Sequence, residues 1–305
     1  MGFTIIELLV VVVILATLLA LMLPAIQSAR NAASRMQCQA NLRSIGQALV
    51  AYEGAKNRFP AGRDEGGEQR LNHSWSTKIL PFVEEQALFD QYDSTLPWND
   101  QKGRPEYTES LPDGPTSDGS AAAVATPPDA GAPPKPPTNY ELAQRNLPVF
   151  QCPATAHEED GAIDFGGNYG TGLTGLEAGF AKGQAWESGV LLAINLRRMK
   201  PEDVRTRGVQ MTEITDGASH TFMVLENSGR PAKQGGQWAN GHNCFSHDRP
   251  YINVQPSNEI FSKHHGLAHA LMADGSLMLL HEDIDWKLLG ALGTRRGGES
   301  AELNN

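Results

Sequence analysis

The feature that most constrains this chain is an apolar run close to its first residue. From Leu8 to Leu23 every side chain is apolar except Thr17, and Ile5 and Ile6 extend the run. A helix needs about 20 apolar residues to cross a bilayer. A secretory signal peptide has a shorter apolar core, a basic front and a small-residue cleavage site behind it. This run is longer and no such break follows it, so we expect residues 1–24 to hold one membrane-spanning helix.

The helical pattern continues beyond Pro24, through residues 25–57. Proline inside a helix favours a bend, which we expect here. Apolar side chains at steps of four and three form one stripe of an amphipathic helix. The stripe consists of Cys38, Leu42, Ile45, Leu49 and Tyr52. We predict a single helix of about 50 residues, about 75 Å long, whose second half packs on a globular head.

A single carboxylate, Glu7, interrupts the apolar run. A charged side chain at the centre of a membrane helix costs about 2.5–3.5 kcal/mol, and less near its end. Either the Glu7 side chain reaches back to the membrane surface, or Glu7 has a function that offsets this free energy.

Residues 2–24, GFTIIELLVVVVILATLLALMLP, resemble the cleavage and methylation motif of type IV pilins and type II secretion pseudopilins. The resemblance implies that a prepilin peptidase cuts after Gly2 and that Phe3 becomes the N-methylated first residue. It also implies that Glu7 neutralises the α-amine of a neighbouring subunit and sets the assembly register. The implied partners are the prepilin peptidase, other pilin or pseudopilin subunits and the membrane.

The charges that flank the span give a different orientation from the motif. Prepilin leaders are normally basic, yet only Met1 and Gly2 precede Phe3, so we expect the natural start to lie upstream. Arg30 and Arg35 follow the span, and the positive-inside rule alone would place the head in the cytoplasm. We follow the motif, which implies a single-pass protein with its head in the periplasm or at the cell surface.

Residues 58–296 have the pattern of one α+β head. Lys78–Tyr92 has apolar residues at helical spacing, and Asp274-Gly275 between two apolar runs predicts a two-residue hairpin turn. Residues 111–139, rich in proline, alanine and glycine, predict a flexible insertion, and residues 297–305 a disordered tail. Candidate strands are Pro148–Cys152, Gly189–Leu196, Thr221–Glu226, Leu267–Ala273 and Ser276–His281. We expect the long N-terminal helix to pack on a mainly antiparallel sheet, as in pilin-like heads.

Several segments of the head resemble a family of prepilin-like proteins of unknown function that is named for a C-terminal H-x9-DG signature. His264, Asp274 and Gly275 supply this signature. The resemblance implies a pilin-like head but no known activity. The other matching segments are RMQCQANLRSIGQALVAYEGAKNRFPAG, SWSTKILPFVEEQALFDQYD, VFQCPA and ITDGASHTFMVLE.

Three cysteines are too few for a disulfide scaffold, and none forms a C-x-x-C pair. Cys38 lies on the apolar stripe and Cys152 on a candidate strand that faces it. In an oxidising compartment the two would form a disulfide if their Cα atoms came within about 7 Å. Two buried free thiols are the alternative, and we expect Cys244 to stay unpaired.

Six of the nine histidines fall between His242 and His281. Nitrogen and oxygen atoms of this region could bind a metal, but no H-E-x-x-H pattern is present. We expect structural or surface histidines, with metal binding and catalysis as weaker alternatives, and hence no metal site, cofactor or catalytic residue. The residues considered as ligands are His242, His247, His264, His265, His269 and Asp274.

The net charge of −10 repels phosphate backbones, so we expect no nucleic-acid partner. The expected function is that of a non-enzymatic structural subunit, or minor component, of a type IV pilus-like or type II secretion-like filament. The alternative is a membrane-anchored extracytoplasmic module that binds a ligand or a metal.

Overall fold

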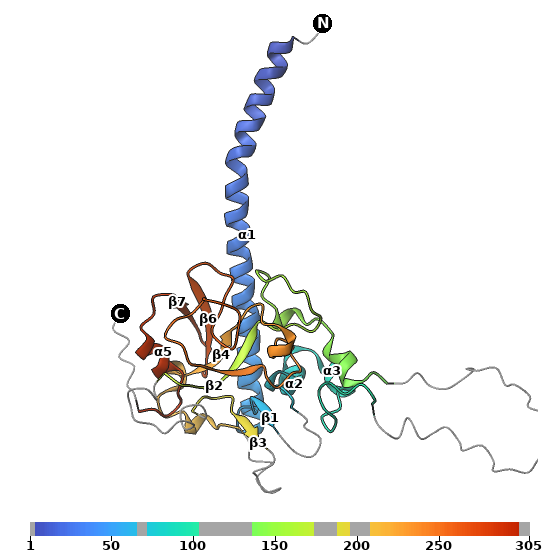
Figure 1. Ribbon diagram of the computed structural model, residues 1–305, viewed down its shortest axis with the longest axis vertical. Helices are drawn as coiled ribbons and strands as arrows, with labels where there is room; N and C mark the ends of the chain where they lie inside the picture. The colour runs from blue at the N-terminus through green and yellow to red at the C-terminus, as the bar shows by residue number, and fades with distance from the viewer. Residues whose placement is uncertain (1–3, 66–71, 104–135, 174–187, 196–207, 299–305) are drawn as a thin grey trace, which may run out of the picture.

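The structure is a computed structural model, which describes residues 4–65, 72–103, 136–173, 188–195 and 208–298 (Figure 1). Gly2 and Phe3 lie outside the described residues, as do residues 111–135 of the expected insertion and residues 299–305 of the expected tail. The expected end of the insertion at residue 139 is wrong, because Thr138 caps a short helix and both Thr138 and Asn139 are buried.

The longest element is helix α1 (Ile5–Lys56), which continues through Pro24 for 52 residues. Its residues 4–33 are exposed and stand clear of the head (Figure 1). The predicted stripe faces the head, with Cys38, Leu42, Ile45 and Leu49 fully buried and Tyr52 half-buried. The division of α1 into an exposed apolar half and a packed amphipathic half is therefore confirmed.

A five-stranded sheet, in the order β5-β2-β4-β6-β7, forms the centre of the head. β2 pairs with β5 in parallel, and every other neighbouring pair is antiparallel. This sheet and the long helix confirm the predicted α+β fold. The strands are β2 (Phe165–Thr171), β4 (Phe222–Glu226), β5 (Cys244–His247), β6 (Leu267–Met272) and β7 (Leu277–His281).

The two faces of this sheet pack against different helices. In β6, Leu271 packs in the core that contains the buried stripe of α1. Ala268 and Ala270 pack on the other face, in a core that includes Leu289 of helix α5 (Trp286–Leu292). Successive side chains of a strand point to opposite faces, so β6 places odd-numbered residues, His269 among them, toward α1.

Shorter elements complete the head. Within the described residues, the other helices are α2 (Trp75–Ile79), α3 (Gln86–Gln91) and α4 (Asn139–Ala143). The 3-10 turns there are η1 (Leu80–Val83), η3 (Pro148–Phe150), η7 (Met211–Glu213), η8 (Ala218–His220) and η9 (Ala232–Gln234). A second, two-stranded sheet pairs β1 (Arg63–Glu65) with β3 (Ala193–Asn195) in parallel.

Three predicted elements are wrong in detail. Of the strand expected over Gly189–Leu196, only Ala193–Asn195 forms a strand among the described residues. The helix expected over Lys78–Tyr92 is divided into α2, η1 and α3, because Pro81 supplies no main-chain N–H at the start of η1 and Glu84, at φ +67°, ends η1 in the left-handed conformation. The strand expected over Pro148–Cys152 begins as a 3-10 turn, in which the main-chain N–H of Gln151 donates to the carbonyl of Pro148 at 3.1 Å.

The predicted hairpin between β6 and β7 is present, with a loop of three residues in place of two. Met272 and Ser276 close the loop, because the main-chain N–H of Met272 donates to the Ser276 carbonyl at 2.9 Å. Gly275, at φ +86°, then takes the left-handed position that a three-residue loop requires.

Candidate functional site

A fully buried carboxylate, Glu226, lies at the end of β4. Its Oε1 accepts hydrogen bonds from the hydroxyls of Ser228 at 3.0 Å and Ser262 at 2.7 Å. Its Oε2 accepts from the main-chain N of His269 at 3.0 Å and from the ring Nδ1 at 2.7 Å. Burying a charge costs much free energy unless it is paired and hydrogen-bonded. These four donors make this carboxylate tolerable inside the head.

His269 lies on β6 and is fully buried. Because Nδ1 donates to Glu226, Nε2 is left as an acceptor, and the side-chain amide of Gln39 on α1 lies 3.4 Å from it. The ring stands edge-on to that of His264, with 5.1 Å between centroids. The expectation of a buried, hydrogen-bonded histidine at this position matches these contacts.

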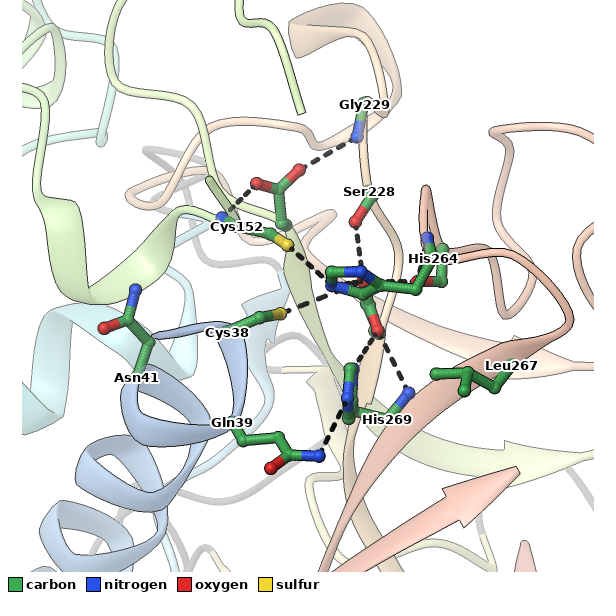
Figure 2. Close-up of polar contacts among 12 residues, drawn as sticks. Cys38, Gln39, Asn41, Cys152, Ser228, Gly229, His264, Leu267 and His269 are labelled. Atoms are coloured by element: carbon green, nitrogen blue, oxygen red, sulfur yellow. Dashed lines mark hydrogen bonds and ion pairs between the residues drawn. The ribbon is translucent and has the colours of Figure 1, made fainter. Parts of the chain in front are cut away.

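The thiols of Cys38 and Cys152 lie close to the ring of His264 (Figure 2). The Nε2 atom of His264 is 3.3 Å from the Sγ of Cys152 and 4.0 Å from Oε1 of Glu226. The Sγ of Cys38, on α1, is 3.9 Å from the same Oε1. Cys38 and Cys152 lie close enough for each thiol to shift the pKa of the other.

The contacts shift the proton affinities of these groups in different directions. The hydrogen bond from Cys38 lowers the pKa of Cys152 to about 6, burial opposes this, and the hydrogen bond with His264 lowers it further. Donation to Cys152, together with burial, raises the pKa of Cys38 well above its usual range. Burial alone would lower the pKa of His264, but Cys152 and the Glu226 carboxylate raise it.

Asn41 holds the segment that carries Cys152 against α1. Its side-chain amide donates to the carbonyls of Pro148 and Gln151, each at 2.8 Å. One helical turn therefore supplies both Cys38 and the side chain that places Cys152 beside it. This geometry gives a physical reason for the Cys-x-x-Asn pattern in the sequence.

A second buried carboxylate, Asp164, fixes the main chain at Cys152. Its Oδ2 accepts from the main-chain N of Cys152 at 2.6 Å, and its Oδ1 accepts from that of Gly229 at 2.9 Å. The Nε2 of His157 lies 3.0 Å from Oδ2, and this carboxylate raises the pKa of His157. Asp164 thereby joins the segment after η3 to the loop after β4.

The structure brings together only part of the predicted set of ligands. His264 and His269 meet, whereas His247 pairs with Glu259 at 2.6 Å, and Asp274 accepts from the main-chain N of Ser276 in the hairpin loop. His242 and His265 also lie outside the cluster, the first beside asparagine side chains and the second exposed.

All three cysteines are buried free thiols in this structure. Cys244, on β5, donates to the Leu191 carbonyl at 2.8 Å. The disulfide between Cys38 and Cys152 stays a prediction, although the two sulfurs are neighbours.

Sequence reasoning missed Glu226 and Asp164 as members of this site. Glu226 had a usable signal, because it is the charged end of the otherwise apolar strand Phe222–Glu226. Asp164 had none, because its hydrogen bonds from the main chain at Cys152 and Gly229 leave no local sequence pattern.

The other predicted site residue, Glu7, lies at the exposed end of α1 and forms a capping box. Its carboxylate Oε2 accepts from the main-chain N of Thr4 at 2.9 Å and from the Thr4 hydroxyl at 2.8 Å. The main-chain N of Glu7 donates back to that hydroxyl at 3.3 Å. This reciprocal arrangement stabilises the start of a helix. It is a role of Glu7 different from the two expected ones, which were reaching the membrane surface and pairing with the α-amine of a neighbouring subunit.

Comparison with known proteins identifies a family but no relative of known activity. No curated protein and no solved structure matches the chain. A family model described as "Protein of unknown function (DUF1559)" matches residues 27–249, more than half of the chain. The match includes Cys38, Cys152 and Glu226, and it excludes the apolar run and His264. The chain therefore belongs to the DUF1559 family of proteins of unknown function.

Proposed function

We propose that this protein is a membrane-anchored structural subunit, major or minor, of a type IV pilus-like or type II secretion-like filament. The observation that carries the proposal is the exposed apolar half of α1. In the part of the chain that the structure describes, none of the residues in its most apolar 18-residue window is buried. An apolar helix of this length can cross a membrane.

Such a surface requires lipid or other apolar helices around it, because large exposed apolar patches are unfavourable in water. Lipid would cover this apolar surface while the protein is in the membrane. In a filament, the apolar halves of α1 from other copies would cover it. A subunit that offers one surface to a different surface of the next copy builds an open helical assembly.

The packed half of α1 supports the same proposal. Leu42, Ile45 and Leu49 are fully buried against the head, and Asn41 ties the helix to η3. The head is therefore attached rigidly to α1, so the position of the apolar half also fixes the position of the head, as a filament subunit requires.

Processing completes the proposal. A prepilin peptidase would cut between Gly2 and Phe3, the new α-amine would be methylated, and the head would lie outside the cytoplasm. The carboxylate of Glu7 would then pair with the α-amine of a neighbouring copy. The resemblance of residues 2–24 to the prepilin motif supports this step.

The test compares Glu7→Ala with Thr4→Ala, because the structure joins these two residues in one capping box. Both variants break the box, but only Glu7→Ala removes the carboxylate. We expect membrane insertion of both, and filaments in the sheared surface fraction from Thr4→Ala alone. Equal filament yields from the two variants would contradict the assembly role of Glu7.

A second candidate function is a membrane-anchored module that binds a ligand through its head. The buried cluster of Cys38, Glu226, His264 and His269, with Cys152 beside His264, favours it. The two functions are compatible in one protein.

A further inference from the structure

We propose that Cys38, Cys152, His264 and Glu226 form a binding site for a divalent cation, with Zn²⁺ as the best fit. The site is independent of filament assembly, because each of the four residues lies in the head or on the packed half of α1.

The spacing of the four ligand atoms matches a tetrahedral site. Zinc bonds of about 2.0–2.3 Å to nitrogen, oxygen and sulfur place neighbouring ligand atoms about 3.3–3.8 Å apart. The Nε2 atom of His264 lies 3.3 Å from the Sγ of Cys152 and 4.0 Å from Oε1 of Glu226. The same Oε1 lies 3.9 Å from the Sγ of Cys38. The ligand atoms of Cys38, Glu226 and His264 all lie within 4.8 Å of one another. The three distances lie within a few tenths of an ångström of the tetrahedral range, so small shifts would bring these atoms toward one ion.

The type of ligand selects the ion. Thiolate and imidazole ligands favour zinc and other transition metals, whereas calcium and magnesium require sets of oxygen ligands. Two thiolates and one carboxylate carry three negative charges in a site that is closed to solvent, and a divalent cation offsets two of them. The site is buried on every side, with Cys38, Cys152 and Glu226 at 0% exposure and His264 at 9%.

The surroundings hold the carboxylate as a metal ligand requires. Carboxylates that bind metals are themselves hydrogen-bonded, and such partners fix their orientation. Both hydrogen bonds from His269 go to Oε2, which leaves Oε1 facing the sulfur of Cys38 at 3.9 Å. The hydroxyls of Ser228 and Ser262 also support Oε1. His269 is therefore a positioning residue in this proposal.

The ligands come from four segments that are far apart in the sequence. Cys38 lies on α1, Cys152 follows η3, Glu226 ends β4 and His264 precedes β6. An ion bound by all four would cross-link the long helix to the sheet and to two connecting segments. Structural zinc sites have this arrangement, with four protein ligands and no open position.

The test measures metal content on the full chain, purified in detergent without added metal or chelator. We expect about one zinc ion per chain. We also expect that an alkylating reagent modifies Cys38 and Cys152 only after the zinc has been removed. Cys38→Ser, Cys152→Ser and His264→Gln should lower the zinc content to background. Cys244→Ser is the matched control, a buried thiol outside the site, and should retain zinc. His269→Gln should keep the site but weaken its affinity about 10–100-fold.

Titration of the metal-free wild type with Co²⁺ guards against variants that fail to fold. We expect the strong near-ultraviolet absorption of thiolate-bound cobalt together with the visible bands of a tetrahedral ion. Wild-type protein that holds neither zinc nor cobalt would overturn the proposal. Recovery of Cys38 and Cys152 in one disulfide-linked peptide, or equal zinc loss in Cys244→Ser, would overturn it too. These measurements use the unassembled chain, so their outcome does not depend on whether filaments form.

Discussion

His269 donates two hydrogen bonds to one oxygen of Glu226, from its main-chain N at 3.0 Å and from its ring Nδ1 at 2.7 Å. This double contact joins β6 to the end of β4 through side-chain chemistry, in addition to the strand pairing. It fixes the direction of the carboxylate at the centre of the buried cluster.

Removal of this carboxylate should destabilise the head strongly. Glu226→Ala leaves the N–H groups of His269 and two serine hydroxyls without an acceptor, and breaking a buried pair costs about 3–5 kcal/mol. We expect a loss of that size in the free energy of unfolding, measured by urea denaturation of the full chain in detergent. Glu226→Gln should lose less. Glu158→Gln, at an exposed residue, is the control, and an equal effect from it would contradict the role assigned to Glu226.

His73 should make the stability of the head depend on pH. Its side chain is buried; its Nε2 donates to the Ser94 carbonyl at 3.2 Å, and its Nδ1 accepts from the Tyr92 hydroxyl at 2.7 Å. Burial, and then the charge of Lys78, lowers the pKa of His73 from 6.5 to about 4. Below pH 6.5 the unfolded chain therefore binds a proton that the folded chain does not, so stability falls between pH 6.5 and pH 4. The loss is about 3 kcal/mol.

The variant His73→Gln isolates this effect. Urea denaturation at pH 7, 5.5 and 4 should show a smaller decrease for the variant than for the wild type, since glutamine does not titrate. Other groups titrate in both proteins and cancel in the difference. If the free energies of unfolding of the two proteins decreased in parallel with pH, His73 would have the same pKa in the folded and unfolded chains, which would contradict the prediction.

Deletion of residues 113–137 should leave the head folded. The deletion ends just before Thr138, which caps α4, and it spares Asn139. The side-chain amide of Asn139 donates to the carbonyls of Asp93, Leu96 and Pro97. We expect equal thermal midpoints for the deleted and full-length chains. Asn139→Ala, in contrast, should lower the midpoint by several degrees, because each lost hydrogen bond costs about 1 kcal/mol. A large decrease on deletion would show that the removed segment packs on the head.

Much of the fold could be predicted from local sequence patterns. The spacing of Cys38, Leu42, Ile45 and Leu49 gave the buried face of α1, because a helix brings such positions to one side. Apolar runs similarly predicted β4, β6 and β7 close to their observed bounds.

Other elements could not be predicted because distant contacts decide them. β2 contains three glycines, which are unfavourable in an isolated strand. A side chain at Gly167 would begin only 3.0 Å from the ring of Trp75 on α2, so the absence of a side chain permits this close approach. β5 has the polar sequence CFSH and forms through its pairing with β2.

The candidate site was predicted in part for the same reason. Cys38 and Cys152 were expected to face each other, and His264 and His269 were considered as ligands, yet nothing local linked the two cysteines to the two histidines. Glu226, the residue that joins them, was considered only as the end of a strand. The hydrogen bonds of Asn41 that bring Cys152 to α1 also span more than 100 residues of sequence.

The central claim, that this chain is matured as a prepilin-like subunit, is tested most directly by mass spectrometry of its mature N-terminus. The protein should be purified from membranes of a host with an active prepilin peptidase, alongside Gly2→Ala as the control. Our account predicts a wild-type chain that begins at Phe3 with one methyl group on its α-amine, and a control that keeps its leader. A wild-type chain that retains Gly2, or that has been cut behind the apolar run at Leu23, would contradict it.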